Sequence, residues 1–150
     1  MDPLTALGVA SNAVQLLTFA GGLLDKGRKI YRSADGALVE NQDLETTATT
    51  LRRLIEPLAK PFANRKLKGT ELELQILCES CKDATAELLN ALEKLKVQGK
   101  RNKWRSLWLA FRCVWSEEHI KNLSSRLEQY RRQLDTVLLI TLRYVYAHLS

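Results

Sequence analysis

The spacing of apolar residues predicts helices along almost the whole chain. Apolar positions recur at intervals of three and four, and no segment of useful length alternates between apolar and polar residues as a half-buried strand does. A first helix is expected to run from Pro3, a residue well suited to a first helical turn, to about Arg32. The segment 33–36 is then expected to form the first turn.

Two further helices carry regular apolar stripes. The second is expected to kink or end at Pro57 and Pro61, because proline lacks the N–H that a helix interior uses. The third is expected to open at the capping-box pair Thr70 and Glu73 and to stop at Gly99. The stripe of the second helix comprises Leu44, Ala48, Leu51, Ile55 and Leu58, and that of the third comprises Leu74, Leu77, Cys81, Ala84, Leu88, Leu92 and Leu95.

The last third of the chain predicts a short helix over 104–114 and then a long one. Ser116, followed by Glu117 and Glu118, is typical of a helix cap and an acidic first turn. The long helix has a near-heptad apolar seam, expected to lie against the other helices or to continue into a partner. The seam comprises Ile120, Leu123, Leu127, Tyr130, Leu134, Val137, Thr141 and Tyr144, before a final apolar run.

These elements together predict an all-α fold. We expect a single domain over residues 1–150, organised as a helical bundle of about five helices. Four of them would form a four-helix-bundle-like core, and the fifth would be the short, basic, Trp-rich helix.

The first predicted helix differs from the others because residues 3–24 carry no charge. Asp2 and Asp25 close this segment, and at about 1.5 Å per residue it would cover roughly the 30 Å of a bilayer core. Asn12, Gln15 and the glycines interrupt its apolarity, so any membrane insertion is expected to be conditional. The cluster that follows would stay on the cytosolic side and bind anionic lipid headgroups; it comprises Lys26, Arg28, Lys29 and Arg32.

A helical wheel separates this segment into a small polar arc and an apolar arc. The polar arc holds Thr5, Gly8, Ser11, Asn12, Gln15, Thr18 and Gly22, and the apolar arc holds Leu7, Val9, Ala10, Ala13, Val14, Leu16, Leu17, Ala20 and Leu24. Leu4 and Phe19 are apolar exceptions on the polar side. The residues expected to insert are Leu4, Leu7, Gly8, Val9, Ser11, Asn12, Val14, Gln15, Leu16, Leu17, Phe19 and Leu24.

Two interpretations of this helix remain open. In a membrane, small residues such as Gly8 and Gly22 would allow close helix contact, and Asn12 could hydrogen-bond across that contact. Alternatively, the segment is the most buried helix of a bundle, and its small residues permit close approach there. The two are compatible if burial in a resting form gives way to release in an active one.

The net charge of +6 is concentrated in one place. From Lys94 to Ser116 the chain has basic residues and no acid. Tryptophan and arginine at an apolar border suit a membrane interface; the candidates are Lys100, Arg101, Lys103, Trp104, Arg105, Trp108 and Arg112. The alternative is a core helix whose aromatic side chains pack against the last helix. Nucleic acid is not expected as a partner, because no helix-turn-helix, zinc or RNA-binding signature accompanies the charge.

No pattern predicts catalysis. Three cysteines, an odd number, and the absence of a basic n-region indicate a reducing, cytosolic setting. Cys78 and Cys81 form a CxxC on a helical stripe, but with only His119 and His148 elsewhere a zinc site is not expected, and Cys81 is interpreted as a core residue. Phosphate-binding glycine loops, HExxH and nucleophile elbows are absent. We therefore expect a non-enzyme with no catalytic residue, metal or cofactor.

Several short motifs, taken in order, resemble the N-terminal HeLo-like domain of fungal NOD-like receptors, which are STAND ATPases with a NACHT module. They are Met1-Asp2-Pro3-Leu4, Gly8-Val9-Ala10-Ser11-Asn12, Tyr31 followed by Ser33-Ala34-Asp35-Gly36, Asn41, and Val114-Trp115-Ser116 before Leu127. The resemblance covers essentially the whole chain. Because no nucleotide-binding module, repeat or amyloid-forming tail follows Ser150, we expect an N-terminal part of a longer receptor or a stand-alone copy.

The resemblance implies a helical-bundle domain of programmed cell death, related in concept to the HeLo domain of heterokaryon incompatibility and to mixed-lineage kinase domain-like protein. In such domains oligomerisation frees an N-terminal helix to attack the membrane, a role that falls here on Leu4 to Leu24. The function expected is self-association and conditional membrane insertion in fungal innate immunity, from a cytoplasmic resting location. The expected partners are a second copy, a NACHT/STAND receptor module and anionic lipids. The alternative is a protein-binding adaptor or regulatory domain that uses the seam of the last helix and never meets lipid.

Overall fold

The computed structural model describes residues 3–32, 44–59, 69–97, 111–112 and 114–149. Its elements are α1 (Pro3–Arg32), α2 (Leu44–Ile55), the 3₁₀ helix η1 (Glu56–Leu58), α3 (Thr70–Val97) and α5 (Glu117–Leu149). Every regular element in these ranges is helical, which confirms the all-α prediction. The predicted short helix over 104–114 falls mostly outside the described residues; within it, only 111–112 are described as helical.

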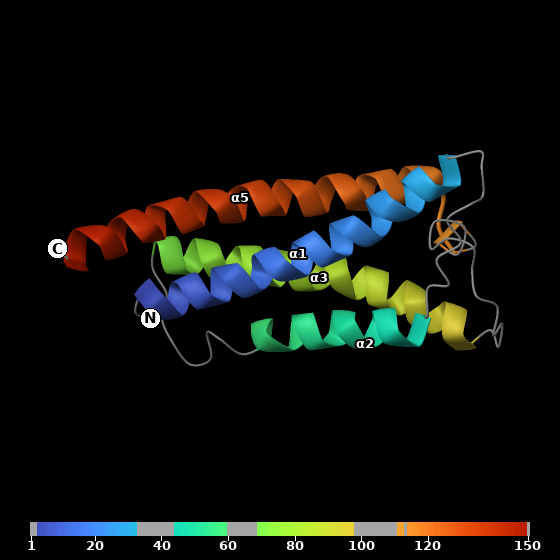
Figure 1. The fold of residues 1–150 in the computed structure, drawn as a ribbon, viewed down its shortest axis with the longest axis horizontal. Coiled ribbons are helices and arrows are strands. Elements are labelled where there is room, and N and C mark those ends of the chain that lie inside the picture. The colour runs from blue at the N-terminus through green and yellow to red at the C-terminus, as the bar shows by residue number, and fades with distance from the viewer. Residues whose placement is uncertain (1–2, 33–43, 60–68, 98–110, 113, 150) are drawn as a thin grey trace.

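Successive helices run in opposite directions, as in an up-down-up-down bundle (Figure 1). The chain runs out along α1, back along α2 and η1, out along α3 and back along α5. As a result, the first turns of α1 and α3 and the last turns of α5 lie at the same end of the bundle, where both chain ends are marked. We call this the terminal end.

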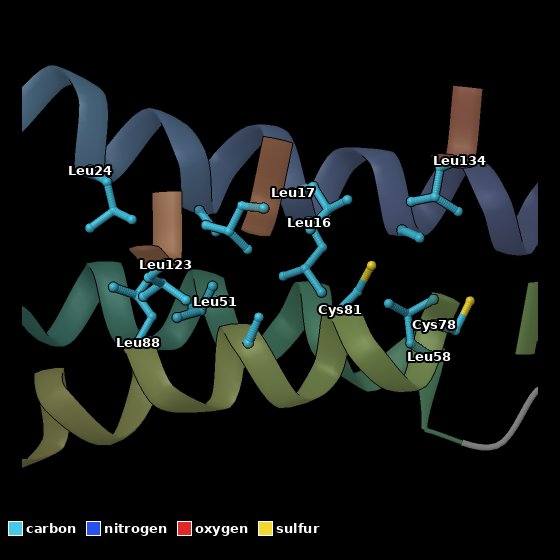
Figure 2. Packing of buried hydrophobic residues seen from close by; sticks show 14 of the residues in the cluster. Leu16, Leu17, Leu24, Leu51, Leu58, Cys78, Cys81, Leu88, Leu123 and Leu134 are labelled. Atoms are coloured by element: carbon cyan, nitrogen blue, oxygen red, sulfur yellow. The ribbon is translucent and has the colours of Figure 1, made fainter. Parts of the chain in front are cut away.

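One hydrophobic cluster joins the four α-helices named above. Figure 2 shows leucines from α1, α2, α3 and α5 pointing into a common layer, with the thiols of Cys78 and Cys81 beside them. All seven positions of the predicted α3 stripe are buried, and on α2 and η1 Ala48, Leu51 and Leu58 are buried with Ile55 packed against them. The predicted α5 seam is buried from Ile120 to Thr141, apart from half-buried Tyr130. Tyr144 is 53% exposed, so the buried seam ends one step earlier than the pattern predicted.

The helix boundaries follow from backbone chemistry. The Ser116 hydroxyl accepts a 3.1 Å hydrogen bond from the His119 N–H, which confirms the predicted cap of α5. Pro57 lies in the 3₁₀ turn that follows α2, as expected for a residue without an N–H. α3 begins at Thr70, which confirms its predicted start, but the Glu73 N–H donates to the Gly69 carbonyl at 3.1 Å and not to the Thr70 side chain, so the predicted capping-box bonding is wrong. Gly69 has φ 59°, a left-handed conformation that favours glycine.

Candidate functional site

The apolar arc of α1 forms its inner face. Seven side chains of this arc are buried: Val9, Ala10, Ala13, Leu16, Leu17, Ala20 and Leu24. They pack into the cluster against α5, α3 and α2, and α5 is the principal neighbour. The half-buried Val14 and Phe19 pack at the edge of the same cluster. In this structure α1 is therefore a core helix, in agreement with the second of the two interpretations.

The polar arc of α1 faces water. Thr5, Gly8, Ser11, Gln15, Thr18 and Gly22 are exposed, and Asn12 is half-buried. From Gly8 to Gly22 the exposed members follow one another at spacings of three and four, so they form a continuous stripe along the helix. Leu4, 68% exposed, continues this stripe at the terminal end. We call these seven exposed residues, Leu4 included and Asn12 excluded, the outer stripe of α1.

The segment Leu4–Asp25 is long and apolar enough to cross a membrane, and it is the one such segment among the described helices. Of the stretch tested, 39% is buried inside the bundle. A core helix of a water-soluble bundle passes the same test of length and composition. What separates α1 from an ordinary core helix is therefore the character of its exposed side.

Gly8, Gly21 and Gly22 of α1 have no packing role in the bundle. A Cβ atom placed on Gly8, Gly21 or Gly22 would meet nothing within 4 Å. Close helix approach therefore does not depend on these glycines here, contrary to that part of the buried-helix interpretation; Ala10, Ala13 and Ala20 occupy the buried positions instead. Each interior glycine costs roughly 0.5–1 kcal/mol of helix stability relative to alanine.

Apolar packing is the main force that holds α1 from Leu4 to Leu24, since that segment has no ionisable side chain. Two ion pairs between described residues join other helices. Arg126 of α5 binds Glu87 of α3 at 2.9 Å, and Arg52 of α2 binds Glu93 of α3. These pairs are partly exposed, so each contributes only about 0.2–1 kcal/mol. They tie α2, α3 and α5 together without involving the candidate insertion segment.

The predicted lipid-binding cations lie on the last turns of α1. Lys26, Arg28, Lys29 and Arg32 follow Leu24 on the same continuous helix, at the opposite end of α1 from Pro3. Positive charge at a helix C-terminus also complements the helix dipole. The helix therefore joins an uncharged segment directly to a basic one.

A surface cavity of about 470 Å³ separates part of α1 from α5. Its α1 wall carries the backbone of Gly21 and Gly22 with Asp25, and its α5 wall carries Glu128 and Arg131. The remaining lining residues are Leu17, Thr18, Ser124 and Leu127. The cavity shows that the α1–α5 contact is incomplete towards the C-terminal half of α1.

The Trp-rich segment is described only at its end. Lys100, Arg101, Lys103, Trp104, Arg105 and Trp108 lie outside the described residues. Arg112 is exposed, while Phe111 is fully buried. The Trp115 ring stacks on Phe111 with centroids 5.4 Å apart and lies 4.9 Å from the His119 ring. This end of the segment therefore packs into the bundle, as the core-helix interpretation predicted.

The described residues offer little for catalysis or metal binding. Cys78 and Cys81 are free and buried, and desolvation by burial raises the pKa of each thiol from 9.0 to about 12. Such thiols are inert at neutral pH because the reactive thiolate is scarce. Within the described ranges no group of three or more His, Cys, Asp or Glu side chains is positioned to hold a metal ion.

Sequence reasoning missed one feature, an apolar outer surface at the end of α5. Leu139, Ile140, Leu142, Tyr144 and Tyr146 are all exposed. The signal was present as the final apolar run, in which apolar residues lie on both sides of the helix wheel. The wheel alone does not say where the neighbouring helices end, and in the bundle they leave these residues on both flanks of α5 exposed.

Comparison of the chain with models of known protein families, with curated proteins and with solved structures found no match. The resemblance to HeLo-like domains therefore stays a prediction that rests on the motifs named above.

Proposed function

We propose that this chain is a non-enzymatic signalling and cell-death execution domain that self-associates and, when triggered, inserts α1 into a membrane. The observation that carries the proposal is the exposed side of α1, which has no charged residue from Leu4 to Leu24. Moving one charged side chain to the centre of a bilayer costs about 2.5–3.5 kcal/mol on insertion scales. A core helix that stays in water has no need to avoid that cost along its whole outer face.

The energy needed to release α1 is compatible with a conditional event. The buried side chains of its inner face contribute about 10 kcal/mol of hydrophobic stabilisation. Insertion into lipid would recover much of this free energy, because the same side chains would again be removed from water. The difference in free energy between buried and inserted α1 then depends on two costs. One is the transfer of polar residues such as Asn12 and Gln15 into lipid, and the other is the exposure of the apolar groove that α1 leaves behind.

Self-association would lower the free-energy cost of exposing the apolar groove that α1 leaves behind. Removing α1 would uncover buried side chains of the other helices, for example Leu127, which lines the same cavity as Leu17 of α1. Contacts between several released domains would remove such surfaces from water again. In the membrane, the outer stripes of neighbouring α1 helices could face one another, where Gly8 and Gly22 permit close contact and Ser11 and Gln15 can hydrogen-bond.

The charge distribution supports one orientation of the inserted α1 helix in the membrane. In the proposed state, Lys26, Arg28, Lys29 and Arg32 remain at the cytoplasmic surface and bind anionic headgroups. The resting domain is cytoplasmic and reaches the membrane only on activation. The resemblance to HeLo-like domains of fungal NOD-like receptors favours the same mode of action, with a NACHT/STAND module as the element that brings copies together.

A second candidate function is an adaptor that binds protein and never meets lipid. The exposed apolar side of α5 from Leu139 to Tyr146 favours it, because exposed apolar patches of this kind mark interaction surfaces.

The test is leakage of a dye from anionic vesicles by the purified chain. We expect leakage by the wild type and weaker leakage by Gly8→Leu, since Gly8 has room for a side chain in the bundle but would separate helices in a membrane. Asn122→Leu, at an exposed site on α5, is the matched control and should leak like the wild type.

A triple alanine variant of Lys26, Arg28 and Lys29 should bind anionic vesicles more weakly by about 1 kcal/mol for each cation. The matched control removes three exposed cations of α5, namely Lys121, Arg131 and Arg132, and should lose much less. If the wild type causes no leakage at any concentration and all variants behave alike, the membrane proposal is wrong and the adaptor remains.

A further inference from the structure

Among the described elements that pack against α1, the shortest is α2 with the 3₁₀ helix η1. The helix α1 contacts α5, α3 and these two elements, and Figure 1 shows α2 and α5 at opposite edges of the bundle. The helices α3 and α5 have 28 and 33 residues, whereas α2 has 12 and η1 adds three. We call residues 44–58, which comprise α2 and η1, the α2–η1 segment. One side of α1 is therefore covered by a short element.

Few side chains fix the α2–η1 segment in the core. Ala48, Leu51 and Leu58 are fully buried, and the half-buried Leu54 and Ile55 pack against the cluster. By contrast, α1 buries seven side chains and α3 buries all seven positions of its apolar stripe. Hydrophobic stabilisation is roughly proportional to the apolar area removed from water. Detaching the α2–η1 segment therefore loses less of this stabilisation than detaching α1 or α3.

The sequence of α2 contributes little helix stability of its own. Four of its twelve residues are threonines, namely Thr46, Thr47, Thr49 and Thr50. Threonine is a poor helix former because its branched side chain loses rotamer freedom in a helix. A helix of this length is marginal in water without tertiary packing. Pro57, in η1, lacks the N–H that a longer α-helix would use. The α2–η1 segment therefore depends on its few core contacts to stay helical.

The ion pair between Arg52 and Glu93 joins α2 to α3, but it is weak. The two side chains are 45% and 38% exposed, so water screens their attraction. In native proteins, the elements that open locally are those with few buried apolar contacts and with polar contacts open to water. The α2–η1 segment has both properties.

We propose that the α2–η1 segment opens as a separate unit while α1, α3 and α5 stay folded, and that this opening is the step that permits α1 to leave the bundle. The first part concerns the chain in water and needs no lipid. The second part rests on the proposed function and supplies its regulation. Because the segment contacts α1 directly, its opening removes part of the cover of α1. Conditions that keep the segment closed retain α1 in the core.

The first test is hydrogen exchange of the purified chain in lipid-free buffer, measured by peptide mass spectrometry at several urea concentrations below the unfolding transition. After correction for intrinsic exchange rates, amides of α2 should exchange about 100-fold faster than those around Leu88 of α3. Their rates should also change little with urea, because a local opening exposes little new surface. Amides of α2 that exchange as slowly as those of α3, with the same dependence on urea, would overturn the proposal.

A matched pair of threonine substitutions tests the link to α1. Thr49 of α2 and Thr136 of α5 are both exposed, and alanine favours the helix at either site. Thr49→Ala should slow the exchange of α2 about threefold, and it should slow leakage from anionic vesicles by a similar factor. Thr136→Ala should leave both rates unchanged, because α5 stays helical when the α2–η1 segment opens.

Charge reversal at the ion pair tests the opposite direction. Arg52→Glu should speed the exchange of α2 about threefold or more and should lower the protein concentration at which leakage begins. The double variant with Glu93→Arg should restore at least part of the protection. Arg53→Glu makes the same change of charge at the neighbouring exposed residue and should have a smaller effect on exchange and on leakage.

Failure of this inference differs from failure of the membrane proposal. If Thr49→Ala slows the opening of α2 but leaves leakage unchanged, or if the wild type leaks while α2 exchanges only by global unfolding, the inference is wrong and the proposed function stands. If α2 opens locally in water but the wild type never causes leakage, local opening is retained and the proposed function is removed.

Discussion

Helices α1 and α3 bury similar apolar stripes in the same core, yet their exposed sides differ in kind. The exposed side of α3 is charged, with Glu73, Glu79, Asp83 and Lys94, and its Glu87 and Glu93 bind cations of α5 and α2. The exposed side of α1 from Leu4 to Leu24 has only small, uncharged polar and apolar residues. Burial alone would assign the two helices the same role. Under the proposed function this difference matters, because an uncharged exposed side costs less to transfer into lipid than a charged one.

Substitutions at core positions should have the largest effects on the free energy of unfolding. Leu88→Ala on α3 and Leu16→Ala on α1 each remove a fully buried side chain and should lower the free energy of unfolding by about 2–5 kcal/mol, measured by urea denaturation. Leu88→Ala should also cause leakage at a lower protein concentration, because it weakens the bundle that retains α1 and leaves α1 itself unchanged. Unchanged leakage by Leu88→Ala would show that the bundle does not restrain α1.

A charged residue on the outer stripe should give α1 a charged exposed side, as α3 has, and should oppose insertion. Gln15 is exposed, so Gln15→Lys should change the free energy of unfolding by less than about 0.5 kcal/mol. Insertion should become less favourable by about 2.5–3.5 kcal/mol, which a vesicle-leakage titration would detect as a loss of roughly 100-fold. Asn90→Lys makes the same change on the exposed side of α3 and should leave leakage unaltered. Equal leakage by the two variants would contradict the account.

The thiols of α3 report whether its buried face is uncovered. Figure 2 shows Leu16 of α1 pointing towards the face of α3 that carries Cys81. Because burial raises the pKa of both thiols to about 12, Cys78 and Cys81 should react very slowly with a maleimide at pH 8 in buffer. With anionic vesicles, labelling measured by peptide mass spectrometry should accelerate at least tenfold as α1 leaves, and Gln15→Lys should suppress the acceleration. Slow labelling throughout leakage would show that α1 stays in place.

Substitution of a glycine in α1 should have a small effect on the free energy of unfolding, and it should change stability and leakage in opposite directions. Gly22→Ala should raise the free energy of unfolding by about 0.5–1 kcal/mol, because a Cβ atom there meets nothing within 4 Å and alanine favours the helix. If Gly22 permits helix contact in the membrane, the more stable variant should leak less than the wild type. Increased leakage together with increased stability would remove the glycines from the mechanism.

The sequence predicted most of the fold because the buried stripes are strictly periodic. The α3 stripe from Leu74 to Leu95 and the Ser116 cap of α5 are present as expected. The wheel of α1 also separated most of its buried and exposed positions; the half-buried residues are Leu7 and Val14 of the apolar arc and Asn12 and Phe19 of the polar side. Periodicity predicted these features because each depends on one helix and on the side that it turns to the core.

The features that the sequence did not predict depend on neighbours in space. Tyr144 continues the α5 seam in sequence but lies where the other helices no longer cover α5, so it is exposed. The start of α3 is a local exception: the Glu73 N–H bonds the carbonyl of Gly69, the residue just before the helix, where the sequence predicted a capping box. The roles of Lys26 to Arg32 and of the segment from Lys100 to Trp108 stay predictions.

The central claim is that α1 changes its environment from the core of the bundle to lipid. A nitroxide label on Val14→Cys, at the edge of the core, tests it by collision with oxygen, which concentrates in lipid, and with a water-soluble nickel complex. With anionic vesicles that are leaking, the account predicts more collision with oxygen and less with nickel at this site, and no change at Asn122→Cys on the exposed side of α5. Identical collision rates at Val14→Cys with and without vesicles, while leakage proceeds, would contradict it.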